Sequence, residues 1–96
     1  MMFDANPQKY LETTAELNAH LLVNKVPFTV APLYDGYQFT FPWCEGDVVC
    51  HNGSYGANRG HVESMDFPWD EGDVTEDTVE QMAVNIIVYY KKLKGE

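Results

Sequence analysis

Apolar residues recur at helical spacing near both ends of the chain, and they alternate with polar residues in its middle. Residues 7–24 predict an amphipathic helix, because Asn6 can cap it and Pro7 suits its first position. Its apolar stripe comprises Tyr10, Leu11, Thr14, Leu17, Leu21 and Leu22.

A second helix is predicted from Thr75 or Thr78 to about Leu93. Thr78 and Gln81 fit a capping box, while acidic residues near its start and lysines near its end complement the helix dipole. The basic cluster of Lys91, Lys92 and Lys94 is thereby explained without a binding partner. The apolar stripe comprises Val79, Met82, Ala83, Ile86, Ile87, Tyr90 and Leu93.

Between the helices the pattern changes to that of β-strands. Residues 26–33 are rich in apolar and β-branched side chains, and residues 37–41 alternate after the turn signal Asp35-Gly36. Residues 48–51 predict a third strand. The glycine-rich residues 52–60 predict a loop, and residues 61–67 predict a short edge strand that Pro68 ends.

This order predicts an α+β fold in one compact domain, residues 1–96. We expect an N-terminal helix, a three- to four-stranded antiparallel meander and a C-terminal helix, with both helices on one face of the sheet. The other face would then be partly solvated. With 45% apolar residues, a chain of this length can bury a modest core without a disulfide or a metal.

The composition is strongly acidic, with a formal net charge of -9. Such a charge disfavours direct binding to nucleic acid, and no basic patch compensates it. We find no membrane span and no basic, apolar start typical of a signal peptide, so we expect a soluble cytoplasmic protein.

One eight-residue segment occurs twice, with a single mismatch at its fourth place. Residues 41–48 read Phe-Pro-Trp-Cys-Glu-Gly-Asp-Val, and residues 67–74 read Phe-Pro-Trp-Asp-Glu-Gly-Asp-Val. Turn chemistry explains most of these residues as scaffold. An alternative is that Trp43 and Trp69, each beside carboxylates, form two related contact platforms, which exposure of at least one indole would support.

The negative charge is concentrated between residues 63 and 80, where no lysine or arginine occurs. This stretch contains eight carboxylates: Glu63, Asp66, Asp70, Glu71, Asp73, Glu76, Asp77 and Glu80. It can be an ordinary solvated surface. It can also imitate the phosphates of nucleic acid and occupy the basic groove of a nucleic-acid-binding protein.

The spacing of cysteine, histidine and glycine residues gives little support for a metal site, a catalytic site or a phosphate-binding loop. Cys44, Cys50, His51 and His61 lack the spacing of common zinc sites, and no nucleophile signature is present. We therefore expect no metal, no cofactor and no enzymatic activity, and we expect both cysteines to be free thiols. The three-glycine loop lacks the Gly-Lys-Ser/Thr of a P-loop, although Arg59 could bind an anion or pair with a carboxylate.

The small size, the acidic balance and the segment from Phe67 to Val74, which leads through Thr75 into the C-terminal helix, resemble short uncharacterised proteins of phages and prophages of Gram-positive bacteria. The resemblance covers about the C-terminal two thirds of the chain and brings no functional residues with it. It implies a protein that acts on host machinery, as anti-CRISPR proteins and other DNA mimics do.

The leading prediction is therefore a non-enzymatic protein that blocks a basic, nucleic-acid-handling host protein. Its predicted contact residues are Trp43, Tyr55, Glu63, Asp66, Trp69, Asp70, Glu71, Asp73, Glu76 and Asp77. One alternative is a module that binds a small anionic or aromatic ligand through Trp43, Tyr55 and Arg59. A third is an assembly protein that dimerises through a sheet edge.

Overall fold

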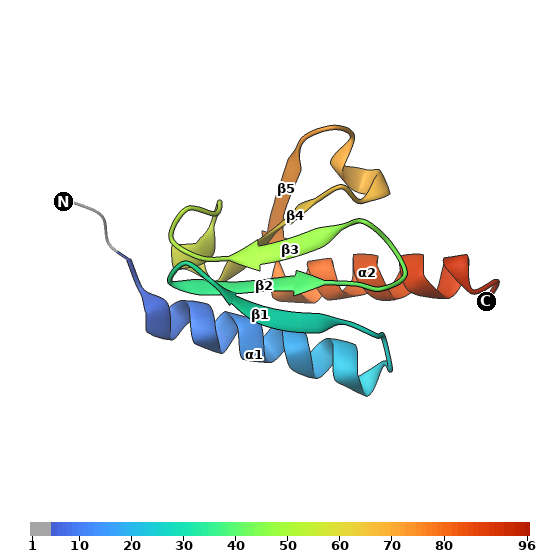
Figure 1. The fold of residues 1–96 in the computed structure, drawn as a ribbon, viewed down its shortest axis with the longest axis horizontal. Coiled ribbons are helices and arrows are strands. Elements are labelled where there is room, and N and C mark those ends of the chain that lie inside the picture. The colour runs from blue at the N-terminus through green and yellow to red at the C-terminus, as the bar shows by residue number, and fades with distance from the viewer. Residues whose placement is uncertain (1–4) are drawn as a thin grey trace.

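A computed structural model describes residues 5–96 and shows two long helices packed against one sheet (Figure 1). The regular elements, in chain order, are α1 (Pro7–Val23), β1 (Thr29–Leu33), β2 (Gly36–Thr40), β3 (Asp47–Cys50), η1 (Ala57–Arg59), β4 (His61–Met65), η2 (Pro68–Asp70), β5 (Val74–Thr78) and α2 (Val79–Leu93). The elements η1 and η2 are single 3-10 turns.

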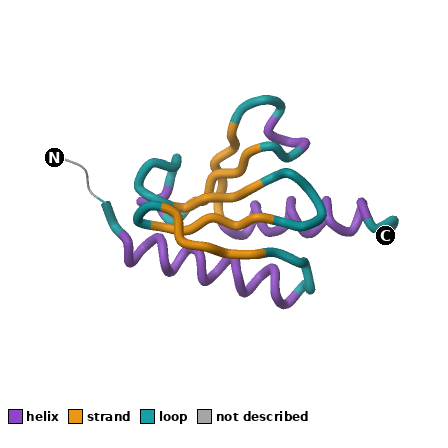
Figure 2. Tube along the Cα trace, viewed as in Figure 1, coloured by secondary structure: helices purple, strands orange, loops and turns teal. Residues whose placement is uncertain are grey.

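The five strands form an antiparallel meander in which each strand pairs with the next, in the order β1-β2-β3-β4-β5 (Figure 2). Helix α1 packs across β2 and β3, α2 packs across β4 and β5, and the two helices contact each other. The predicted α+β fold is confirmed. The predicted strand count of three to four is wrong, because the sheet has five strands.

The extra strand is β5, which precedes the second helix. Its acidic residues suit the start of a helix, and for that reason the sequence predicts a helix that begins as early as Thr75. In the structure residues 74–78 instead pair along the whole of β4, from Met65–Val74 to His61–Thr78. Strand β4 is consequently an internal strand and not the predicted edge strand.

Both helices begin where a capping side chain allows it. The Oδ1 atom of Asn6 accepts a hydrogen bond from the Lys9 amide at 3.2 Å, and Pro7 follows at the first helical position. The Thr78 hydroxyl accepts from the Gln81 amide at 3.2 Å, so α2 starts after the second of the two predicted threonines.

The core lies between the helices and one face of the sheet. Tyr10, Leu17 and Leu21 from α1 and Met82 and Ile86 from α2 are fully buried there. They meet the inward residues of the central strands: Phe39, Val48, Cys50, Val62 and Ser64. Since side chains alternate along a strand, Asp47, Glu63 and Glu76 belong to the opposite, uncovered face.

Candidate functional site

The two copies of the repeated segment meet in space around one tyrosine of α2. The rings of Phe41 and Phe67 are 5.7 Å apart in an edge-to-face arrangement. Trp43 and Trp69 both contact the ring of Tyr89, with centroids at 5.8 and 6.0 Å. We call these five residues the aromatic cluster. The repeat therefore builds one joint structure from two places in the chain.

The glycine of each copy is required for a different reason. A Cβ atom added to Gly46 would lie 2.6 Å from the Phe67 ring, so the first copy leaves space for the second. Gly72 has nothing within 4 Å of such an atom, but its φ of +86° is a conformation that glycine adopts without strain. The same glycine in the two copies therefore meets two different requirements, lack of space at Gly46 and a positive φ at Gly72.

Both indoles are half-buried, and both indole N–H groups donate hydrogen bonds within the chain. Trp43 donates from Nε1 to the carbonyl oxygen of Pro27 at 2.8 Å, and Trp69 donates to the hydroxyl of Ser64 at 3.0 Å. The Trp69 ring stacks on Phe67 at 4.5 Å. These residues hold the fold together and still leave part of each ring accessible to solvent.

The two copies differ at one position, which is Cys44 in the first copy and Asp70 in the second. Asp70 is only 5% exposed, and its carboxylate accepts hydrogen bonds from the Ser64 hydroxyl at 2.8 Å and the Phe67 amide at 3.0 Å. The η2 turn is fixed to β4 in this way. A carboxylate so placed supports the scaffold, and we remove Asp70 from the predicted contact surface.

The remaining carboxylates of the acidic stretch do not form one continuous row. On the uncovered sheet face, the Glu63 carboxylate accepts from the Tyr55 amide at 2.8 Å, and Glu76 pairs with Arg59 and with His61, whose Nδ1 lies 2.5 Å from it. These contacts lower the pKa of Glu76, with the His61 hydrogen bond as the largest cause.

Within residues 63–80, three of the four exposed carboxylates lie in the loop between β4 and β5. Asp66, Glu71 and Asp73 are all exposed, and Asp73 accepts a hydrogen bond from the next amide, that of Val74. Asp77 is half-buried on the edge strand opposite Val62. Glu80 lies on the first turn of α2.

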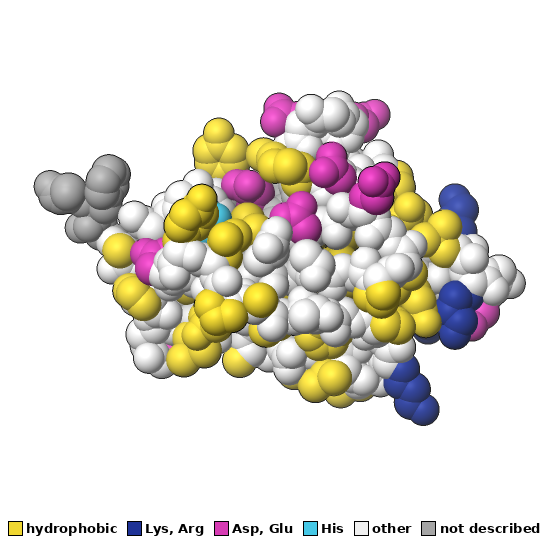
Figure 3. Space-filling view, in the orientation of Figure 1, with side chains coloured by type: hydrophobic (Ala, Val, Ile, Leu, Met, Phe, Trp, Pro, Cys, Tyr) yellow, Lys and Arg dark blue, Asp and Glu magenta, His cyan; other side chains and the backbone are white. Residues whose placement is uncertain are grey.

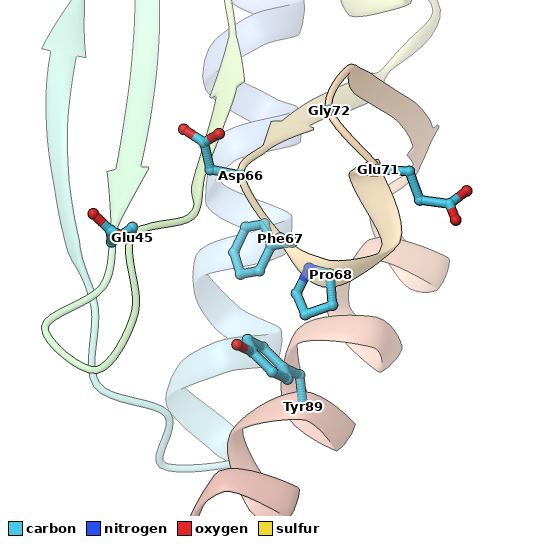
Figure 4. Close-up of a pocket in the computed structure, with 7 residues that line it drawn as sticks. All are labelled: Glu45, Asp66, Phe67, Pro68, Glu71, Gly72 and Tyr89. Carbon is cyan, nitrogen blue, oxygen red and sulfur yellow. The ribbon is translucent and has the colours of Figure 1, made fainter.

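A pocket of about 530 Å³ lies where this loop approaches the first copy of the repeat (Figure 4). We call it the acidic pocket, and its lining residues are Glu45, Asp66, Phe67, Pro68, Glu71, Gly72 and Tyr89. Figure 4 shows Glu45 and Asp66 on one side of the Phe67 ring and the Glu71 carboxylate turned to the other side. Tyr89 reaches up to the pocket from α2.

A second groove begins on the other side of the same turn. It has a volume of about 300 Å³, is mostly apolar, and is lined by Pro68, Trp69, Asn85, Val88, Tyr89 and Lys92. Pro68 and Tyr89 belong to both depressions. An acidic surface and an apolar surface are therefore adjacent at this end of the sheet.

The residues proposed for a small-ligand site are not gathered in one place. Trp43 belongs to the loop at the β2–β3 end of the sheet, whereas Tyr55 and Arg59 belong to the loop at the opposite end (Figure 1). Tyr55 is 64% exposed, and the guanidinium of Arg59 is paired with Glu76. The predicted pairing of Arg59 with a carboxylate is the arrangement found.

The four cysteine and histidine residues considered as metal ligands also have separate surroundings. Cys50 is buried, its Sγ donates to the His61 carbonyl oxygen at 3.6 Å, and burial raises its pKa to about 11. Cys44 is half-buried in the first repeat copy, and His51 packs edge-on against Tyr34. Neither cysteine is in a disulfide, as expected.

Within residues 5–96, the side chains whose metal-ligand atoms do converge are Glu16, His20 and Glu80, with these atoms within 4.8 Å of one another. Glu16 and Glu80 lie close together between the helices, and the hydrogen bond that the pair can form when one carboxyl is protonated raises the pKa of Glu16 and lowers that of Glu80. The i, i+4 spacing of Glu16 and His20 is visible in the sequence, but the approach of Glu80 depends on the helix packing.

Of the seven residues that line the acidic pocket, only Asp66 and Glu71 are among the predicted contact residues. Phe67, Pro68 and Gly72 are predicted as scaffold of the repeat. The sequence places Glu45 only in a turn, and it leaves Tyr89 outside the apolar stripe of the second helix. Glu45 belongs to the repeat and so stands in a segment that the sequence singles out, but the packing of both copies against Tyr89 is seen only in the structure. No sequence pattern specifies which residue of α2 the two copies pack against.

Comparison of the chain with protein-family models, with curated proteins and with solved structures found no match. In the part of the chain that the structure describes, neither helix is sufficiently long and apolar to cross a membrane. Any assignment of function must therefore come from the chemistry and geometry of the surface.

Proposed function

We propose that this chain is a non-enzymatic inhibitor that binds a basic, nucleic-acid-handling protein and blocks its nucleic-acid site. It would act as a DNA mimic, in the manner of some anti-CRISPR proteins. With the resemblance to phage and prophage proteins, we infer that it is phage-encoded and works in the cytoplasm of a bacterial host.

The observation that carries this proposal is the lack of internal compensation for the negative charge. Among residues 5–96, only Glu76 and Glu96 form ion pairs with a basic side chain. Figure 3 shows several acidic side chains over the upper part of one face and basic side chains at its edge, near the end of α2. Lys92 lines the neighbouring apolar groove but forms no ion pair with a carboxylate of residues 5–96. Negative charge without internal compensation produces a field that attracts a basic partner and accelerates association.

The scaffold holds part of this charge in fixed positions. Asp47 and Glu63 belong to neighbouring strands, which in a sheet are about 5 Å apart, and both are hydrogen-bonded within the chain. Gln38 donates to Asp47, and the Tyr55 amide donates to Glu63. Fixed carboxylates lose little conformational entropy on binding, which favours affinity for lysine and arginine side chains.

Apolar anchors are available beside the charge. The groove lined by Trp69, Val88 and Tyr89 adjoins the acidic pocket through Pro68 and Tyr89. Partly exposed aromatic residues are typical of the few positions that dominate binding energy at protein interfaces. The proposed contact surface therefore centres on the turn after β4, with Glu45, Asp66, Trp69, Glu71 and Asp73.

The test is capture of proteins from a lysate of a Gram-positive host at low and at high salt, followed by their identification. We expect nucleic-acid-binding proteins that are retained at low salt and released at high salt, since ionic screening weakens this attraction. Retention of proteins that do not bind nucleic acid, or retention that salt does not affect, would overturn the proposal.

A variant pair makes this test specific to the surface. Glu71→Lys combined with Asp73→Lys should slow association with the captured partner, because both residues are exposed in the proposed surface. Glu12→Lys combined with Glu16→Lys changes the charge by the same amount at exposed positions of α1, away from that surface, and is the control. Equal rates for the two proteins would count against the proposed surface.

A further inference from the structure

The acidic pocket has a chemical character that the rest of the acidic surface lacks. Its lining combines three acidic residues, Glu45, Asp66 and Glu71, with three apolar ones, Phe67, Pro68 and Tyr89. Glu45 and Asp66 lie on one side of the Phe67 ring, and the Glu71 carboxylate is turned away from them (Figure 4). Within residues 5–96, none of these three carboxylates has a basic side chain within 4 Å. The pocket thus combines unpaired negative charge with aromatic and proline surface.

We propose that this pocket receives an arginine side chain of the partner protein. This inference rests on the proposed function and specifies which group of a basic partner is recognised. A guanidinium is flat and stacks on aromatic faces, while its N–H groups point outward to carboxylates. Tyr89 and Pro68 supply the apolar contact, and Glu45 and Asp66 supply acceptors on one side (Figure 4).

The spacing of the carboxylates argues against a compact cation. The ligand atoms of Glu45, Asp66 and Glu71 do not all come within 4.8 Å of one another, unlike those of Glu16, His20 and Glu80. A metal ion needs its ligands to converge. A lysine ammonium is a compact point charge and can approach only one of several separated acceptors closely. The five N–H donors of arginine are spread over a fork, which suits acceptors held apart.

The arrangement of the pocket depends on the contact between the two repeat copies. Gly46 closes against Phe67 and brings the preceding Glu45 to the pocket, while Asp66 immediately precedes Phe67. Asp66 has a φ of +66°, a left-handed conformation that aspartate and asparagine tolerate better than most residues. The two acceptors are therefore positioned by backbone and packing.

The experiment uses the whole chain and two probes, an arginine-rich peptide and a lysine-rich peptide of equal length and charge. Affinities are measured by calorimetry at low ionic strength, and amide chemical shifts locate the binding. We expect the arginine peptide to bind more tightly and to shift the amides of Asp66 and Tyr89. Equal affinities for the two peptides would contradict the inference.

Matched variants assign the effect to the pocket. Glu45→Gln and Asp66→Asn each remove one charge, and the asparagine keeps the tolerance for positive φ. Each should weaken the arginine peptide about tenfold, as expected for loss of one charge-assisted hydrogen bond. Glu12→Gln removes the same charge from an exposed position on α1 and should change the affinity less than about twofold.

The outcomes separate the pocket from the general function. If all three variants weaken the peptide equally, binding is a diffuse charge effect and the pocket inference fails, whether or not salt-sensitive host partners are captured. If the pocket variants act as expected but no nucleic-acid-binding partner is captured, the arginine site stands and the inhibitor proposal fails.

Discussion

Single residues of the repeat show why composition alone misassigns roles. Asp70 belongs to an acidic stretch and is predicted from it to be at the contact surface, yet its carboxylate is buried and holds Ser64 and the Phe67 amide. A carboxylate can be buried only where donors are in place to bind it, and here one of these donors is the hydroxyl of Ser64 on β4, six residues earlier in the chain. Sequence spacing does not reveal it.

Replacing Asp70 with alanine should destabilise the fold by about 2 kcal/mol. The substitution removes two hydrogen bonds to a charged acceptor and leaves a buried hydroxyl and a buried amide without that partner. Urea denaturation measures the change. Asp73→Ala is the control, because Asp73 is exposed and should change the free energy of unfolding by less than about 0.5 kcal/mol.

The two thiols should differ in their reaction with a disulfide reagent. Burial and the nearby Asp35 raise the pKa of Cys50 to about 11, so near pH 8 its reactive thiolate is scarce and shielded in the native protein. Burial also raises the pKa of Cys44, but Cys44 is partly accessible. We expect a reagent such as Ellman's to modify Cys44 first and Cys50 only on unfolding; a native Cys50 that reacts as fast would refute this.

At the scale of elements, the periodic patterns predict both helices, their caps and the meander of the first three strands. The fifth strand is missed because its acidic residues are equally suited to the first turn of a helix and to an edge strand. Strand β5 is defined by its pairing with β4, and it presents Glu76 opposite Glu63. Pairing between strands is a property of the fold, and local propensity describes it only weakly.

The two turns of the repeat provide a matched test of local constraint. Gly46→Asn should destabilise the protein by about 1–3 kcal/mol, because a Cβ there meets the Phe67 ring. Gly72→Asn should have a small effect, since space is open and asparagine tolerates a positive φ. Thermal denaturation compares them, and similar losses would show that the two copies do not differ as described.

The contacts of Glu76 make the β4–β5 pair sensitive to acid. Hydrogen bonds from His61 and Arg59 lower its folded pKa below the ordinary 4.5, so its contribution is present above that value and is lost as pH falls through the folded pKa. Glu76→Gln should reduce the loss of stability on acidification. Urea midpoints of both proteins across this range provide the measurement, and parallel curves would contradict the assignment.

At the scale of the whole molecule, the excess of negative charge is evident both in the sequence and on the surface of the structure. The net charge of -9 is evident from composition, and the expectation of no direct nucleic-acid binding rests on it. The acidic pocket is not evident, because Glu45 and Asp66 are 21 positions apart and meet only when the two copies pack together. The proposed function therefore belongs to a surface that the repeat assembles.

The most direct measurement is a competition between this chain and duplex DNA for the captured host protein. If the chain is a DNA mimic, increasing chain concentration should displace labelled DNA completely, and the Glu71→Lys, Asp73→Lys protein should require about tenfold more. Simultaneous binding of DNA and chain to the same host protein, at any ratio, would contradict the proposed function.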